Sequence, residues 1–598
     1  MVRLSKALII MRAAALALEC HPDGPLVPRP RQLEQSATFQ EVLANLTTTL
    51  DAAFQGKIRA GFDTQNTSIS IGIVSFDQAE ADIPVWEYHH LSAENVNGTK
   101  SLDRHSQYLI GSISKAITDA IFLRSGVSPD DPVTKYLPSL ADEKSPTRWE
   151  NITLGALAGQ ASGVVPNYGF SEYYYLKDYF EALGLPHIDN VSYPECGVIG
   201  LNGPCSKEQL LKGMLMSHPI APPETRPVYS NVAFVLLMYA VEAQTGKNYT
   251  ELVREFSASL GMRSTRPSPG DDALAVIPPM PSTWGSNYGD HAPGGGLVST
   301  LADLSSFMHA ILAKSPALAP ATRIRSWLKP RLFSGSPSSS VGSPWEIYRP
   351  PPALIFPAYN ATQDTGGHTV TILSKDGAAY SYHARIALLD EYGLGLAVLT
   401  AGDQSALPPV LDAMYRLVIP AVDVVAREQA IARYVGSFAN SASGDDAVAA
   451  NATLVMDGQL LRLVGLGRGG QDITAALGEM WRVTAGQFLP SELGEITRGY
   501  RLYPAEVERE VTLEDGRRVV EEDWRFEWGV DMSGLETDLP GKGISDGDCR
   551  SWTVTDWIYY GQQPVDRLVF VRDAETGDVV GLEVPFLRTG VMNKVEDV

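Results

Sequence analysis

The stretch "IGSISKAITD", residues 110–119, places two serines and a lysine at the start of a predicted buried helix. Ser112 and Lys115 are three positions apart, so their side chains project from one helix face about one turn apart. A serine hydroxyl is a weak nucleophile until a neighbouring group takes its proton. A lysine can take it when burial or a nearby cation lowers its pKa. Because S-x-x-K also occurs by chance, the rest of the chain must decide between a catalytic pair and an ordinary helical turn.

A second polar motif, "PVYSNVAF" at 227–234, comes directly before an apolar helical pattern. Tyr229 could pass protons if lysines lie close to it, and the Asn231 amide could hydrogen-bond a substrate. The alternative is structural, with Ser230 or Asn231 capping the helix.

The third motif, Lys375-Asp376-Gly377, ends a predicted strand in "LSKDGAAYSYH". Gly377 would let a ligand approach the edge of the sheet closely. The backbone N–H of Ala378 could then bind an oxyanion. The alternative is a plain turn between two strands.

Together and in this order, the motifs resemble the serine β-lactamase and penicillin-binding-protein superfamily, whose class A members carry S-x-x-K, S-D-N and K-T-G. The tyrosine of "YSN" makes the chain similar to the class C branch and its esterase and D-peptidase relatives. Segments 152–165, 222–246 and 293–308 also look like that branch, and the resemblance covers about residues 36–415.

The resemblance implies a role for each catalytic candidate. Ser112 would attack a carbonyl and become acylated, Lys115 would accept or relay its proton, and Tyr229 would act as general base and then as acid to the leaving group. Lys375 would hold Lys115 and Tyr229 in the required protonation states.

Substrate-binding roles are implied for Asn231, Asp376, Gly377 and Ala378, with the N–H groups of Ser112 and Ala378 forming the oxyanion site. Asp376 departs from the superfamily, which commonly has a hydroxyl residue there that helps hold a substrate carboxylate. An aspartate in the cleft would repel a carboxylate by about 1–4 kcal/mol, depending on exposure. We therefore expect a neutral or cationic ester, lactone or amide, unless Asp376 points away from the cleft.

These residues support three hypotheses of function. The first is a secreted serine hydrolase working through an acyl-enzyme on a small molecule or peptide. The second is an acyltransferase or cyclase of a biosynthetic pathway that uses the same residues, and the third is a binding protein on an inactive scaffold. We expect no cofactor and no metal, because the ten histidines are scattered without zinc-site spacing. A net charge of −22 argues against a nucleic-acid partner.

Several features predict secretion. The N-terminus "MVRLSKALIIMRAAALALEC" has a basic start, an apolar run and small residues, which resembles a signal peptide over 1–19; the alternative is an amphipathic helix. The four cysteines allow a Cys196–Cys205 disulfide and a long-range Cys20–Cys549 pair. The rest of the chain contains no run of 18 apolar residues, so the sequence predicts no membrane span.

Glycosylation acceptors are a further feature of a secreted protein. Eight of the fifteen asparagines lie in N-x-[ST] sequences, whereas chance would place about one asparagine in seven there. They are Asn45, Asn66, Asn97, Asn151, Asn190, Asn248, Asn360 and Asn451.

The 598 residues predict more than one domain. We expect an N-terminal arm over 20–35, a hydrolase domain over 36–432 and a β-rich domain over 433–598.

For the hydrolase domain we expect an α/β fold of the β-lactamase/transpeptidase type. Two early strands would pair with a later three-stranded meander. Helices would cover this sheet, and a helical subdomain would adjoin it. The early strands are expected at 67–76 and 85–91, the meander over 368–402, and a Pro/Ser/Gly-rich loop at 334–365. The C-terminal region has the short alternating segments of an all-β domain, and it also resembles, more weakly, a lipocalin-like domain.

Overall fold

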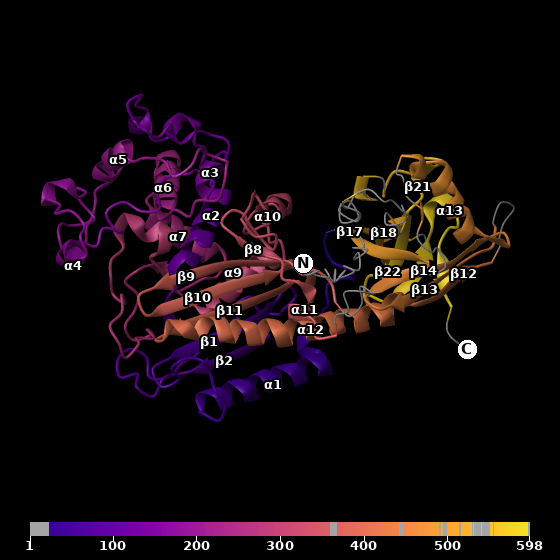
Figure 1. The fold of residues 1–598 in the computed structure, drawn as a ribbon. Coiled ribbons are helices and arrows are strands. Elements are labelled where there is room, and N and C mark those ends of the chain that lie inside the picture. The colour runs from indigo at the N-terminus through magenta and orange to yellow at the C-terminus, as the bar shows by residue number, and fades with distance from the viewer. Residues whose placement is uncertain are drawn as a thin grey trace, which may run out of the picture. The chain divides into compact units, whose positions relative to one another are not determined.

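The computed structural model describes residues 23–358, 367–441, 448–488, 492–493, 499–513, 516–528, 530–531, 540, 551–553 and 555–595 (Figure 1). The predicted signal peptide, the Cys20–Cys549 pair and the Asn360 acceptor lie outside these residues. The chain forms two compact units. The larger comprises Arg31–Pro351 and Val370–Ala421, and the smaller comprises Met1–Pro30, Pro352–Thr369 and Val422–Val598.

An antiparallel sheet of eight strands organises the larger unit, in the order β2-β1-β11-β10-β9-β8-β7-β6. Early and late strands meet where β1 pairs with β11, with Ile71 opposite Val398, as the sequence predicted. The strands are β1 (Ser68–Ser75), β2 (Trp86–His90), β6 (Leu332–Phe333), β7 (Ser339–Val341), β8 (Glu346–Tyr348), β9 (Ile372–Ala379), β10 (Tyr382–Leu389) and β11 (Leu394–Ala401).

Strand β1 is buried along its whole length, although alternating isoleucines predicted a half-buried strand. Its serines are buried because partners satisfy them: Ser70 Oγ lies 2.9 Å from Tyr108 Oη and 2.9 Å from His89 Nδ1. Helix α9 (Leu301–Leu312) packs on β1 and β11. The expected capping signal is present there, because the Thr300 side chain accepts a hydrogen bond from Asp303 N.

The region expected to be a long loop, 334–365, instead carries strands. Strands β7 and β8 lie within it, and with β6 they extend the sheet beyond β9. Each has only two or three residues, too few for a visible alternating pattern among prolines, serines and glycines. Strand β8 brings Glu346 beside β9.

The helical part of the larger unit includes the buried helix α6. Ten consecutive residues of it, from Val232 to Val241, are buried, as an apolar helix of this kind predicts. The helices of this unit besides α9 are α1 (Ala37–Phe54), α2 (Ser114–Arg124), α3 (Leu154–Ala158), α4 (Lys177–Ala182), α5 (Lys207–Met216), α6 (Asn231–Thr245), α7 (Tyr249–Ser259), α8 (Ala292–Gly295) and α10 (Ala321–Trp327), and α12 (Leu407–Tyr434) begins in it. A small sheet joins β3 (Gln107–Leu109), β5 (Leu297–Thr300) and β4 (Arg266–Pro267).

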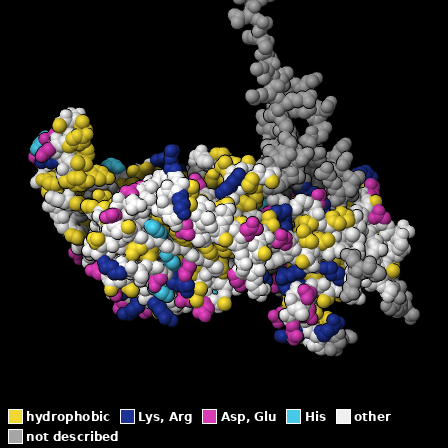
Figure 2. Space-filling model, turned by 90° about the horizontal axis from the view of Figure 1, so that it is seen from below, with side chains coloured by type: hydrophobic (Ala, Val, Ile, Leu, Met, Phe, Trp, Pro, Cys, Tyr) yellow, Lys and Arg dark blue, Asp and Glu magenta, His cyan; other side chains and the backbone are white. Residues whose placement is uncertain are grey.

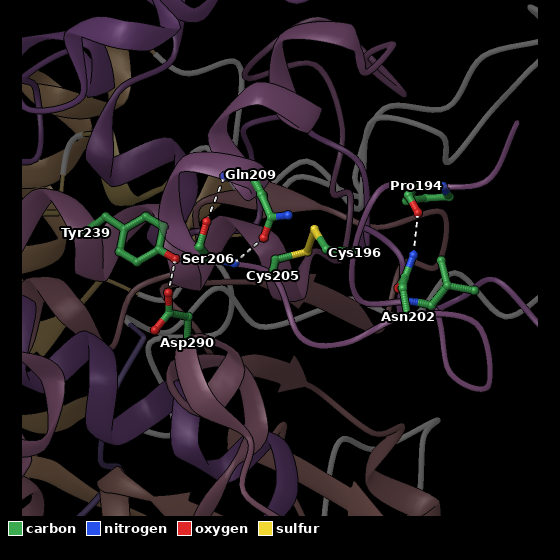
Figure 3. Close-up of a disulfide and its surroundings, with 9 residues drawn as sticks. Pro194, Cys196, Asn202, Cys205, Ser206, Gln209, Tyr239 and Asp290 are labelled. Carbon is green, nitrogen blue, oxygen red and sulfur yellow. Dashed lines mark hydrogen bonds between the residues drawn. A yellow bond between two sulfur atoms is a disulfide. The ribbon is translucent and has the colours of Figure 1, made fainter. Parts of the chain in front are cut away.

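The predicted Cys196–Cys205 disulfide is present and directly precedes α5 (Figure 3). Helix α5 begins with a capping box in which Ser206 and Gln209 bond reciprocally. Nearby, Tyr239 Oη of α6 donates to Asp290 Oδ2 at 2.5 Å. The disulfide closes the loop before α5, and the short helix α4 earlier in the chain buries none of its residues.

Eight strands close into a barrel in the smaller unit, because β13 pairs with both β12 and β14. The barrel strands are β12 (Gly436–Asn440), β13 (Ala450–Asp457), β14 (Leu460–Arg468), β17 (Tyr500–Thr512), β18 (Arg518–Glu527), β22 (Arg567–Asp573), β23 (Val579–Glu583) and β24 (Met592–Lys594). The other described elements are α11 (Pro352–Ile355), α13 (Ile473–Val483), β15 (Gln471–Asp472), β16 (Glu492–Leu493), β19 (Val530–Asp531), β20 (Tyr559–Tyr560) and β21 (Gln563–Pro564).

Aromatic side chains fill the barrel. Trp524 is fully buried and lies 5.4 Å from Phe570 and 4.9 Å from Tyr434, measured between ring centroids. Phe526 and Trp528 continue the cluster at 5.0 Å. An eight-stranded barrel is just wide enough for side chains to fill it, and here aromatic rings form its core.

Candidate active site

Two glycines bring strand β9 against the turn that carries Ser112. This turn is a short 3-10 helix, Gly111–Ile113, directly before α2. Gly111 has φ +49°, and a Cβ on it would lie 2.4 Å from Ala378 N. A Cβ on Gly377 would lie 2.0 Å from Ile110 O. Such contacts are impossible for other residues, so the glycines allow Ser112 to sit beside the end of β9.

Two of the three sequence motifs meet at the Ser112 hydroxyl. Lys115 Nζ lies 2.9 Å from Ser112 Oγ, and Tyr229 Oη donates to the same oxygen at 2.6 Å. Gly294 O of α8 is 3.4 Å away. The residues thus come from a 3-10 turn, the start of α2, the loop before α6, and α8.

Lys115 is fully buried and is surrounded by acceptors. Its Nζ donates to Asn231 Oδ1 at 2.6 Å and to Gly294 O. Burial lowers the pKa of Lys115 well below its usual range, and the positive charge of Lys375 lowers it further, while the Glu346 carboxylate acts in the opposite direction. The surroundings of Lys115 therefore favour its neutral form over its charged form.

Two lysines flank the ring of Tyr229, which is 44% exposed. The Nζ atoms of Lys115 and Lys375 lie 4.8 Å and 5.4 Å from the ring centroid, in cation–π contact distance. Lys375 is itself buried, and its Nζ donates to Glu346 Oε1 and to Asp376 O, the latter at 2.9 Å. The structure thus places Lys375 beside the phenol ring and pairs its charge with Glu346.

Ser230 and Asn231 divide the two roles that the sequence left open. Ser230 is the N-cap of α6 and accepts a hydrogen bond from Ala233 N at 3.0 Å. Asn231 is then the first helical residue, and its amide bridges Lys115 and Asn167, donating to Asn167 Oδ1 at 2.7 Å. Asn231 therefore orients the lysine in addition to facing the cleft.

Asp376 does not carry an uncompensated charge, which corrects the expectation of repulsion. Arg385 of β10 donates to both carboxylate oxygens, at 2.9 and 2.7 Å, and His383 lies 3.8 Å away. Burial acts to raise the pKa of Asp376, but hydrogen bonds and positive charge from His383 and Arg385 outweigh it and lower the pKa to about 2. Successive strand residues point to opposite faces, so Asp376 turns toward Arg385 while Lys375 turns toward Tyr229.

Sequence reasoning missed four participants: Glu346, Gly294, Asn167 and Arg385. Glu346 lay in the segment taken for a loop. Gly294 contributes only a backbone carbonyl, which no side-chain motif reveals. Alternation along β9 and β10 was the available signal for the Asp376–Arg385 pair, since directly opposed residues share a face.

Among the described residues, no group of three or more His, Cys, Asp or Glu side chains could hold a metal ion. None of the described helices combines the length and apolar character needed to cross a bilayer. On the face shown in Figure 2, Lys and Arg side chains are interspersed with Asp and Glu side chains.

Comparison with known proteins agrees with the motifs. Residues 84–420 match the family described as "Beta-lactamase", and residues 426–595 match "Beta-lactamase-like-like, C-terminal domain". The chain is 39% identical to "Beta-lactamase-like protein" of Arthroderma benhamiae, over 96% of both chains. It is 23% identical to "Probable hydrolase M10" of a Phoma species, over 97% of this chain and 93% of that one. A class C β-lactamase from Rhodobacter sphaeroides aligns in structure with a TM-score of 0.44 and 18% identity, covering 64% of this chain and 99% of the other.

Proposed function

The chain belongs to the β-lactamase family, and on that premise we propose that it is a serine hydrolase that cleaves an ester, lactone or amide through an acyl-enzyme. The observation that carries the proposal is the arrangement around Lys115. A neutral amine has two N–H bonds and one lone pair. Asn231 Oδ1 and Gly294 O are pure acceptors that take the two N–H bonds. The lone pair is then left for the third neighbour, the Ser112 hydroxyl.

Acylation follows from this arrangement. Ser112 Oγ attacks the substrate carbonyl carbon as its proton passes to Lys115 Nζ, and the carbonyl oxygen becomes an oxyanion. The N–H groups of Ser112 and Ala378 are proposed to bind it. When the intermediate collapses, the bond to the leaving group breaks and that group takes the Tyr229 proton. The phenolate then recovers the proton that Lys115 holds as an ammonium, whose Nζ lies 4.8 Å from the centroid of the Tyr229 ring.

Deacylation reverses the roles. Water attacks the acyl carbon and gives its proton to Lys115, which is the neutral base at this stage. The bond between the acyl group and Ser112 Oγ breaks, the serine oxygen recovers a proton, and a carboxylic acid leaves. The two catalytic groups end in their starting protonation states.

Covalent labelling tests the proposal. The wild-type chain should form one fluorophosphonate adduct, seen by intact mass, and Ser112→Ala should form none. Ser128→Ala, which removes an exposed hydroxyl just after α2, is the control and should label normally. A wild-type chain without an adduct would favour the binding-protein hypothesis, and labelling of Ser112→Ala would exclude Ser112 as nucleophile.

We further propose that the protein is secreted and N-glycosylated. The Cys196–Cys205 disulfide suits an oxidising compartment. Six of the predicted acceptors are exposed, and Asn66 is half-buried. The exposed acceptors are Asn45, Asn97, Asn151, Asn190, Asn248 and Asn451. The test is the mass of the secreted chain before and after endoglycosidase treatment, with sequencing of its N-terminus; an unchanged mass and an intact Met1 would contradict the proposal.

A further inference from the structure

Two carboxylates adjoin Lys375, and they have different partners. Arg385 Nε and Nη2 donate to the two carboxylate oxygens of Asp376. Glu346 accepts from Lys375 Nζ with Oε1 and from Asp376 N with Oε2, the latter at 2.9 Å. Of the side chains in the second pair, Lys375 is 1% exposed and Glu346 is 38% exposed. The Asp376 side chain is 34% exposed, close to that of Glu346, so the two carboxylates differ in their partners: only Glu346 pairs through its side chain with Lys375.

Lys375 and Glu346 form an ion pair beside Tyr229, and the lowered pKa of Lys115 favours its neutral form. Behind them, Asp376 is paired with Arg385 and lies 3.8 Å from His383. The field of Glu346 reaches the catalytic centre, because its charge acts on Lys115. Without Glu346 the cleft would carry a net positive charge from Lys375.

We infer that Glu346 is the specificity-determining residue that makes this site prefer substrates with an uncharged acyl group over substrates that carry a carboxylate there. The inference rests on the proposed hydrolase function and names its substrate class. Glu346 pairs with Lys375, whose positive charge would otherwise attract a substrate carboxylate. The negative charge of Glu346 would also repel such a carboxylate.

A matched pair of esters measures this preference. p-Nitrophenyl pentanoate and p-nitrophenyl hemiglutarate differ by a terminal methyl against a carboxylate on an acyl chain of equal length. The wild type should favour the neutral ester in kcat/KM. Glu346→Gln should reduce the neutral-to-anionic ratio at least about fivefold at low salt, the scale of one charge contact in high dielectric, and added salt should shrink the change.

Two variants show whether the effect belongs to Glu346. Glu255→Gln removes the carboxylate of another Lys–Glu pair, in which Glu255 of α7 binds Lys247 just before that helix. This variant should leave the neutral-to-anionic ratio unchanged. Asp376→Asn removes the other carboxylate beside Lys375. A shifted ratio in Asp376→Asn with none in Glu346→Gln would overturn the inference.

A binding measurement separates this inference from the proposed function. In the Ser112→Ala background, ligand-observed NMR compares methyl pentanoate with monomethyl glutarate before and after Glu346→Gln. A relative gain for the glutarate supports the inference even if neither p-nitrophenyl ester is hydrolysed. An unchanged relative affinity, in a variant whose circular dichroism matches the parent, overturns it even if hydrolysis is robust.

Discussion

Both units bury aromatic rings completely, but they differ in where lysines are buried. Trp345 in the larger unit and Trp524 in the smaller one are fully buried, whereas Lys115 and Lys375, the two lysines among the largest fully buried side chains, both lie in the larger unit. Burying an aromatic ring stabilises a fold, whereas burying a lysine costs free energy unless it is neutral or paired. The rings of the barrel thus contribute to stability, and the lysines beside Ser112 are costly groups that the proposed chemistry requires.

Replacing a buried lysine should produce the largest effect and test the catalytic half of this comparison. Lys115→Met removes the amine while keeping an unbranched side chain of similar length. Loss of a general base costs about 10²–10⁴-fold, so kcat/KM for p-nitrophenyl pentanoate should fall by at least about 10³. The chain should remain folded by circular dichroism. Activity within tenfold of wild type would place the base elsewhere.

Replacing a buried ring should affect stability instead. Trp524→Ala leaves a cavity beside Tyr434 and Phe570 and removes the indole hydrogen bond to Glu522. The expected loss of unfolding free energy is about 3–5 kcal/mol, measured on the barrel transition in urea. Fluorophosphonate labelling of Ser112 below that transition should stay within about twofold of wild type. A large loss of labelling in a folded variant would break the comparison.

Adding a methyl group at Gly377 should change the geometry of the site without changing its charge. In Gly377→Ala the Cβ would lie 2.0 Å from Ile110 O, so β9 must move away from the Ser112 turn. Loss of an oxyanion donor costs about 10²–10³ in rate, and we expect a fall in kcat of that size. Gly203→Ala is the control, since its Cβ would meet nothing within 4 Å.

A change of pH should produce the smallest effect, a change in kcat/KM of about tenfold per pH unit. Lys115 acts as a neutral amine, so log kcat/KM should fall with slope one as pH drops below its lowered pKa. Stability changes in the same direction: the unfolded lysine titrates near about 10.4 and binds more protons than the folded one, so this group's contribution to stability falls as pH drops from there to the folded pKa. Lys115→Met should lose the acidic limb; a limb that persists belongs to another group.

Much of the site was predictable because its members are reactive side chains in a recognisable order. Lys115 and Tyr229 contact the Ser112 hydroxyl, Asn231 contacts Lys115, and Lys375 lies over the Tyr229 ring, so the motifs predicted which side chains come together. The pairing of β1 with β11 was also predictable, since hydrophobic alternation identifies strands of this length.

The missed features share physical causes. Gly294 acts through a backbone carbonyl, whose position depends on the fold of α8 and not on its side chain. Strand β8 is three residues long, and its pairing with β9 is a tertiary interaction without a local pattern. The sequence left the direction of Asp376 open because the residue type does not give the strand face, and its partner Arg385 on β10 favours the alternative that it points away from Ser112.

The pairing of β1 with β11 has a consequence for biosynthesis. Ser68 is opposite Ala401, so the central sheet cannot close until nearly all of the larger unit has left the ribosome. Ser112 and Lys115 are synthesised before β9, and Lys375 follows Ser112 by 375 − 112 = 263 residues. At about 5–20 residues per second, about 13–50 s therefore pass before β9 can join Ser112 and Lys115, so the site is completed only when the last strands arrive.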